Sequence, residues 1–167
     1  MILLVDTNIF LDLQTIGLLE DVMTVMTVNN SICIEASLFR DEIRQPPDLA
    51  DHLRSLGISI VVATDEEFQL SQEMSSLVPQ LSFYDSITYA VAKTRQYTLL
   101  TGDKRLRQTA VDNGVDVHGL LFLVDEGIKL HIPKDHISAA LQEILRNPRI
   151  FIKPSIIYEK YSAFLSD

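Results

Sequence analysis

MILLVDTN, residues 1–8, opens the chain with a continuous apolar run that ends in polar residues. The run from Met1 to Val5 has two β-branched residues and no polar alternation, which is typical of a strand buried on both faces. Asp6 and Asn8 follow the run. Ligands of open α/β sheets bind just beyond the carboxyl ends of the strands. This stretch therefore predicts an inner strand of a parallel sheet with a polar site at its carboxyl end.

Strand and helix patterns alternate from this strand as far as residue 117. Further strands are predicted at residues 31–34, 58–63, 97–100 and 115–117, with helical patterns between them. Such alternation is typical of a parallel sheet that carries helices on both faces. The predicted fold class is therefore α/β, with three layers and a mainly parallel central sheet of about five strands.

The C-terminal part of the chain has a different pattern. Prolines separate two helical stretches there, at residues 135–145 and 155–165. We expect residues 1–127 to form one domain and residues 128–167 to form a helical C-terminal extension. The apolar residues of the extension should pack on that domain or on a second chain.

The composition is that of a globular protein and excludes several classes. Of the 167 residues, 47% are hydrophobic and 22% are charged, the net charge is −9, and one residue is a cysteine. A single cysteine forms neither an internal disulfide nor a four-cysteine zinc site, and the apolar runs are too short to span a membrane. The negative charge argues against coating nucleic acid through bulk electrostatics. The first basic residue is Arg40, so the N-terminal stretch lacks the basic region of a signal peptide. We therefore expect a cytoplasmic protein.

Two acids are expected at the carboxyl ends of strands, Asp6 after the first strand and Asp103 after the fourth. Both also precede helical stretches, where aspartate is a favoured N-cap, so each has a purely structural alternative. Asn8 and Thr101 share this ambiguity, because either side chain could stabilise a turn or orient a neighbouring carboxylate. The four residues are therefore candidates whose roles the local pattern leaves open.

Asp85 is the only charged residue in the stretch LSFYDSITYAVA, residues 81–92. A helix that is apolar nearly all round is normally buried, and aspartate is rarely buried without a partner. Ser82 lies three residues earlier, so a capping box is the alternative explanation. A capping box would explain the position of the acid but not the lack of other charges on the helix. We therefore treat Asp85 as a candidate site residue.

A fourth acid is expected on the helix after the second strand, where Glu35, Asp41 and Glu42 are the candidates. At about 100° per residue, Glu42 falls on the apolar face defined by Leu38 and Ile43, whereas Asp41 points away. Glu35 lies at the strand–helix junction, where helical phase is unreliable. We choose Glu42 and keep Glu35 as the second choice.

Four carboxylates from four segments are thus expected at one end of one sheet. Carboxylates at close range repel and raise one another's pKa unless a cation joins them. A site with several carboxylate oxygens suits Mg²⁺ or Mn²⁺. Basic residues also gather within a short stretch, either as solvated helix ends or as contacts to phosphates. They are Lys93, Arg95, Lys104, Arg105 and Arg107.

Four stretches also carry a family resemblance. They are VDTNIFL at 5–11, EI at 42–43, LSFYD at 81–85 with Ala90 and Ala92, and LLTGDKRLR at 99–107. Together they resemble the PIN domain, and their order and spacing are most similar to the single-domain PIN ribonucleases of bacterial toxin–antitoxin pairs. The resemblance covers about residues 1–127. Its specific part is the combination of the first and last stretches.

The resemblance implies a three-layer PIN-like fold and a metal-dependent endoribonuclease that hydrolyses RNA phosphodiester bonds with Mg²⁺ or Mn²⁺. It implies that the metal is held by Asp6, Glu42, Asp85 and Asp103. Asn8 and Thr101 would support them, and Lys104 and Arg105 would contact the substrate. RNA is then the expected substrate, and an antitoxin protein and a second copy of the chain, in a homodimer, are the expected partners.

Two alternatives stay open. One is a catalytically inactive PIN-like module that binds nucleic acid or another protein. The other is a Mg²⁺-dependent phosphatase of the haloacid-dehalogenase type, which also has an aspartate after its first strand. Such phosphatases usually need a second aspartate two residues later, where this chain has Asn8.

Overall fold

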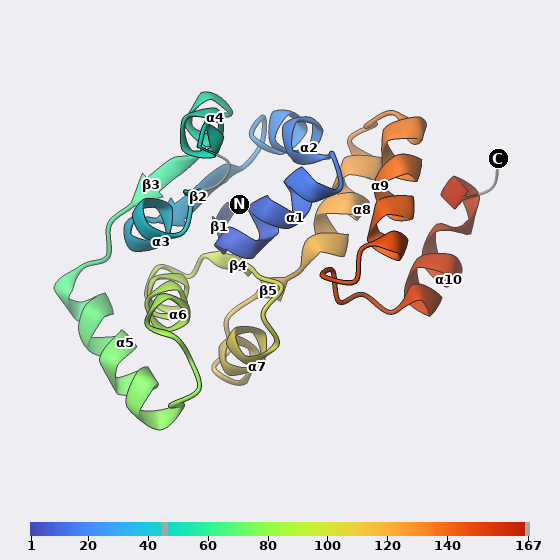
Figure 1. The fold of residues 1–167 in the computed structure, drawn as a ribbon. Helices are drawn as coiled ribbons and strands as arrows, with labels where there is room; N and C mark the ends of the chain where they lie inside the picture. The colour runs from blue at the N-terminus through green and yellow to red at the C-terminus, as the bar shows by residue number, and fades with distance from the viewer. Residues whose placement is uncertain (45–46, 166–167) are drawn as a thin grey trace.

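The computed structural model describes residues 1–44 and 47–165, and within them one five-stranded sheet forms the centre of the molecule (Figure 1). The strands are β1 (Ile2–Val5), β2 (Ser31–Glu35), β3 (Ser59–Val61), β4 (Thr98–Leu100) and β5 (Val117–His118). Their order across the sheet is β3-β2-β1-β4-β5, and every neighbouring pair is parallel. The predicted α/β class is confirmed, and the first strand, predicted as an inner strand, is the central one. Leu3, Leu4 and Val5 are fully buried, as a strand covered on both faces requires.

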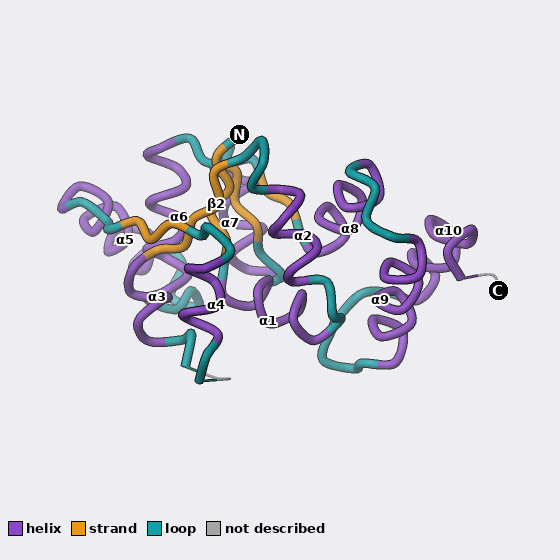
Figure 2. The backbone as a smooth tube through the Cα atoms, turned by 90° about the horizontal axis from the view of Figure 1, so that it is seen from above, coloured by secondary structure: helices purple, strands orange, loops and turns teal. Residues whose placement is uncertain are grey.

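Helices surround this sheet, and the last three gather on one side of it (Figures 1 and 2). The first five are α1 (Thr7–Thr15), α2 (Leu19–Met26), α3 (Ala36–Asp41), α4 (Leu49–Ser55) and α5 (Asp65–Leu77). The others are α6 (Phe83–Arg95), α7 (Lys104–Asp112), α8 (Leu120–Lys129), α9 (Lys134–Arg146) and α10 (Pro154–Leu165). Among the described residues, no helix is both long enough and apolar enough to cross a membrane.

Helix α6 is the buried helix that the sequence predicts. It packs against α5, α7 and strands β2 and β4, and residues 86–92 are all buried. Its N-terminus is closed by a capping box, in which Asp85 N donates to Ser82 Oγ and Ser82 N donates to Asp85 Oδ2, both at 3.0 Å. The box places Asp85 in the first turn of α6, close to the carboxyl end of the sheet.

Strand β5 is shorter than expected and begins later. The sequence predicts a strand at 115–117, whereas the structure has Val117–His118. The cause is the end of α7, because Val115 N donates to Ala110 O at 2.9 Å and Gly114 takes a left-handed φ of 74°. Val115 therefore completes the turn that ends the helix and is not available to the sheet.

Helices α8, α9 and α10 run up, down and up beside the sheet in Figure 1. Helix α8 packs against α1 and α2, α9 packs on α8, and α10 packs on α9. Tyr161 of α10 also contacts α8 directly, because its Oη donates to Asp125 Oδ1 at 2.8 Å. The predicted division after residue 127 lies inside α8, and the division itself remains a prediction.

Candidate active site

Asp6 is the buried centre of the candidate site. It follows β1 and stands at the N-cap position of α1, yet among the described residues its carboxylate makes no capping bond. The side chain is only 5% exposed, and its Oδ2 accepts a hydrogen bond from Thr101 Oγ1 at 2.7 Å. Thr101 follows β4 and is itself fully buried, and its Oγ1 accepts from Asp103 N at 3.0 Å. The ends of β1 and β4 are thus joined through one threonine hydroxyl.

The pKa of Asp6 is raised from 3.8 to about 6. Burial is the largest cause, because it removes water from the charged form, and the hydrogen bond from Thr101 opposes it. The charges of Asp85, Glu42 and Asp103 raise this pKa further. The three other predicted acids therefore lie close enough to act on Asp6, although they come from different segments of the chain.

Asp85 and Asp103 both fill the capping roles that the sequence offered as alternatives. Asp103 is the N-cap of α7, and its Oδ1 accepts from Arg105 N and Leu106 N, both at 2.8 Å. Asp85 uses Oδ2 for the capping box of α6. A carboxylate has two oxygens, so these bonds fix the orientation of each acid and leave its second oxygen for another ligand. Capping and ligation are compatible at both positions.

The second acidic position differs from the expectation in one respect. The helical periodicity predicts Glu42 on the buried face, but Glu42 is exposed, because α3 ends at Asp41 and Glu42 is its C-cap residue. Its charge nevertheless raises the pKa of Asp6. Glu35, the second choice, is 1% exposed and caps α3 by accepting from Ser37 N at 2.6 Å.

Asp41 faces a different set of partners from Glu42. Arg40 donates to it at 2.8 Å and 2.9 Å, and Tyr84 Oη donates to its Oδ2 at 3.3 Å. The hydrogen bond from Arg40 is the main reason why the pKa of Asp41 falls to about 2. Asp41 is therefore held as an ion pair at the end of α3, and its negative charge is largely neutralised.

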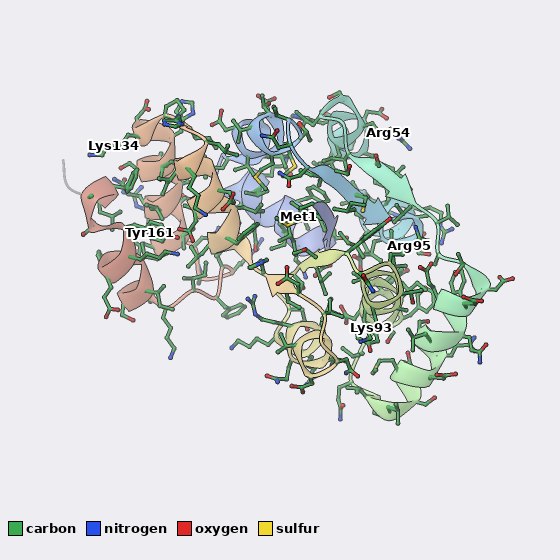
Figure 3. The ribbon with its side chains drawn as sticks, turned by 180° about the vertical axis from the view of Figure 1, so that it is seen from behind. Met1, Arg54, Lys93, Arg95, Lys134 and Tyr161 are labelled. Carbon is green, nitrogen blue, oxygen red and sulfur yellow. The ribbon has the colours of Figure 1, made fainter. Side chains whose placement is uncertain are left out.

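The basic cluster of the sequence is divided by the fold. Lys104 and Arg105 are exposed at the start of α7, next to Asp103, and Arg105 donates to Gln80 O at 3.3 Å. Lys93 and Arg95 lie instead in the last turn of α6 (Figure 3). The Arg95 guanidinium is bound to the buried Glu67 carboxylate at 2.7 Å and 2.8 Å. Arg95 is therefore held in an ion pair between α5 and α6, and phosphate contacts by the other basic residues stay a prediction.

Asp12 is an acid near the site that the sequence argument missed. It is partly buried on α1, and burial raises the pKa of its carboxyl group. Its Oδ2 would lie 3.9 Å from a Cβ atom on Gly102, the residue between Thr101 and Asp103. The only signal in the sequence was a lone acid within an apolar stretch of α1. Asn8, by contrast, is exposed in the first turn of that helix.

The chemistry of these donors fits a divalent cation with a preference for oxygen. The acids and the threonine offer only oxygen atoms, and they place excess negative charge around a buried carboxylate. Within residues 1–44 and 47–165, however, no three His, Cys, Asp or Glu side chains are gathered into a ready-made metal site. The acids surround Asp6 without meeting at one point, so binding an ion requires their side chains to turn toward it.

Comparison with known proteins places the chain in a family. No curated protein matches it. Among solved structures, a PilT N-terminus domain protein from the hyperthermophilic archaeon Sulfolobus solfataricus is similar with a TM-score of 0.51 and 16% identity, over 80% of this chain and 98% of that one. The structure of VapBC2 from Rickettsia felis, bound to a DNA fragment from its promoter, is similar with a TM-score of 0.53 and 16% identity. The match covers 71% of this chain and 98% of that one. A family model described as a PIN domain matches residues 2–164, and the chain therefore belongs to the PIN domain family.

Proposed function

We propose that this protein is a metal-dependent endoribonuclease that hydrolyses RNA phosphodiester bonds. The observation that carries the proposal is the state of Asp6, a buried carboxylate whose pKa is raised to about 6 by burial and by three neighbouring acids. Such an arrangement is unfavourable for the fold alone and becomes favourable when a cation joins the acids. Family membership supports the same chemistry.

In this proposal Asp6, Glu42, Asp85 and Asp103 hold Mg²⁺ or Mn²⁺. A bound divalent cation lowers the pKa of a water molecule and stabilises the leaving oxygen of a phosphodiester. Thr101 keeps Asp6 in one orientation and, through the bond from Asp103 N, fixes the backbone that carries Asp103. Lys104 and Arg105 are exposed beside this loop, where they would contact the phosphates of the substrate, and Asn8 is exposed near Asp6.

We further propose that the protein acts as the toxin of a toxin–antitoxin pair in the cytoplasm. The similarity to the VapBC2 structure supports an antitoxin protein as its partner. A homodimer belongs to the same proposal. Residues 1–127 would carry the reaction, since every proposed metal ligand lies within them, and residues 128–167 would form an extension that serves binding.

The test is cleavage of single-stranded RNA by the purified protein, with added Mg²⁺ or Mn²⁺ and with chelator. Asp6→Asn keeps the shape of the side chain and removes its charge, so cleavage should be lost while the fold persists. Asp112→Asn is the matched control, because Asp112 is an exposed acid at the far end of α7. Wild-type activity in Asp6→Asn, with contaminating nuclease excluded, would refute the assignment.

The same assay separates the two alternatives. An inactive PIN-like module would cleave no RNA with either metal, and its melting temperature would not respond to Mn²⁺. A phosphatase would release phosphate from a generic phosphomonoester and leave the RNA intact.

A further inference from the structure

The stretch from the last residue of α9 to the residue before α10, residues 146–153, combines exposed cations with an exposed aromatic side chain. It reads RNPRIFIK and so contains three cations and no acid, within a protein whose net charge is −9. Arg146, Arg149 and Lys153 are all exposed. Phe151 lies among them and is 86% exposed, more than any other large apolar side chain in the described residues.

The three cations have no acidic partner among residues 1–44 and 47–165. Some cations elsewhere are paired, such as Lys160 with Asp125 and Arg95 with Glu67, whereas others, such as Lys104 and Arg105, are also without an ion pair to a described residue. The ion pairs of the described residues include none from Arg146, Arg149 or Lys153. In an acidic protein, an unneutralised group of cations creates a local positive field that attracts an anionic partner.

Phe151 is held outward by the structure of its own segment. Ile150 is buried in the core, whereas its neighbour Phe151 is exposed. Asn147 fixes the turn, because its Oδ1 accepts from Arg149 N at 3.0 Å and its backbone O accepts from Ile150 N at 3.2 Å. An exposed phenyl ring is costly in water, and the ordered turn at residues 147–150 directly precedes it.

The segment lies at the same end of the molecule as the carboxyl edge of the sheet. Helix α8 begins there, directly after β5, and the connection from α9 to α10 returns to that end of α8 (Figure 1). Arg107 of α7 packs so closely over Gly119, the N-cap of α8, that a Cβ there would lie 2.9 Å from its Nη1 atom. Tyr161 of α10 donates to Leu121 O, in the first turn of α8, at 3.4 Å. The first turn of α8 thus lies between α7, which begins beside Asp103, and α10, which begins at the segment.

We propose that residues 146–153 bind single-stranded RNA, with Phe151 stacked on an unpaired base and Arg146, Arg149 and Lys153 on the adjoining phosphates. Aromatic stacking between phosphate-contacting cations is how proteins hold single strands without reading their sequence. A duplex offers no free base face to such a ring. The choice of RNA rests on the proposed nuclease function, and the segment would hold the substrate strand outside the acidic site.

The absence of tryptophan from the chain allows a direct test. Phe151→Trp, in the Asp6→Asn background to prevent cleavage, places one fluorophore in the segment. Single-stranded RNA should quench its fluorescence by stacking, and duplex RNA of the same length should not. Leu77→Trp in the same background is the control, since Leu77 is 76% exposed on α5. It should not be quenched by either RNA.

Two further variants separate stacking from charge. Phe151→Ala should weaken binding of single-stranded RNA about tenfold without changing its salt dependence, as expected for the loss of one stacked base. Arg149→Ala with Lys153→Ala should lower the slope of log affinity against log salt by about 1.4, because two phosphate contacts are lost. Lys129→Ala with Lys134→Ala, at the end of α8 and the start of α9, should leave the slope unchanged.

The inference is overturned if RNA does not quench the segment tryptophan, or if both double variants change the salt slope equally. Quenching by an acidic peptide and not by RNA would also overturn it and would assign the segment to a protein partner. Failure of the proposed function has a different signature, namely quenching by RNA together with a wild-type protein that cleaves no RNA with any divalent metal.

Discussion

Thr101 and Asp6 lie 95 residues apart in the sequence, and the Thr101 hydroxyl donates a 2.7 Å hydrogen bond to the Asp6 carboxylate. Both side chains are buried, and the same hydroxyl accepts from Asp103 N. One threonine therefore orients the first acid of the candidate site and the loop that carries the last. A change at this hydroxyl should affect both acids.

Thr101→Val should destabilise the protein and raise the pKa of Asp6 further. Valine keeps the shape of threonine but removes the hydroxyl that lowers this pKa. It also leaves Asp103 N without its acceptor. We expect the free energy of unfolding to fall by about 1.5–3 kcal/mol, the range for hydrogen bonds to charged groups. Urea unfolding measures the loss, and Thr101→Ser, which keeps the hydroxyl, should recover most of it.

Asp6 should make the metal-free protein less stable as pH rises from about 4 to 7. The pKa of its carboxyl group is about 6 in the folded protein, against an ordinary value of 3.8. The folded state therefore binds the proton more tightly, so this contribution is fully present below 3.8 and is lost as pH rises through about 6. The shift corresponds to a cost on the order of 3 kcal/mol at neutral pH.

Asp6→Asn should remove that pH dependence. The variant should be more stable than the wild type at pH 7 in chelator, and the two should converge at pH 4. Urea unfolding at the two pH values measures the difference. Equal stability of the two proteins at both pH values would contradict the raised pKa of Asp6.

Mn²⁺ should stabilise the protein through Asp85 as well as Asp6. A cation that binds only the folded state adds about 2.7 kcal/mol at a hundredfold excess over its Kd. Asp85→Asn should gain much less, although its side-chain oxygen can still accept from Ser82 N and preserve the cap of α6. Thermal melts with and without Mn²⁺ at fixed ionic strength compare it with Asp112→Asn. If Mn²⁺ raises the melting temperature of the wild type, Asp85→Asn and Asp112→Asn equally, Asp85 only caps α6 and is not a metal ligand.

Glu42→Gln should reduce RNA cleavage more than Asp41→Asn does. The charge of Glu42 acts on Asp6, whereas Asp41 is neutralised by Arg40 and bound by Tyr84. Because both residues are close to the end of α3, each variant controls for the local structure of the other. Cleavage rates at saturating Mn²⁺ would compare them. If Asp41→Asn is inactive and Glu42→Gln is active, the second acidic metal ligand is Asp41 and not Glu42.

Arg95→Ala should reduce stability and leave RNA binding by the folded protein unchanged. Glu67 is 1% exposed, and removal of Arg95 leaves its carboxylate buried without its cationic partner. The expected loss is about 3 kcal/mol, at the lower end of the range for broken buried pairs because Arg95 is partly exposed. Lys93→Ala, in the same turn of α6, should change stability little. If Arg95→Ala stays folded but binds RNA more weakly, Arg95 contacts the phosphates of the RNA and the basic residues from Lys93 to Arg107 act together.

Features that depend on local pattern could be predicted from the order of residues along the chain. The apolar run at residues 1–5 predicted an inner strand, because a strand covered on both faces has no polar alternation. Ser82 and Asp85 marked the start of α6, and the lack of other charges on that helix predicted its burial. These signals are short in range, since hydrogen bonds and side-chain periodicity within one element create them.

Which side chains meet could not be predicted in this way and became clear from the fold. It exposed Glu42 where α3 ends and paired Arg95 with a glutamate 28 residues away. It also buried Asp6 beside Thr101 and set the charges of three distant acids around it. The physical reason is that burial and Coulomb interaction depend on distance in space, which the order of strands in the sheet fixes and the spacing of residues along the chain does not.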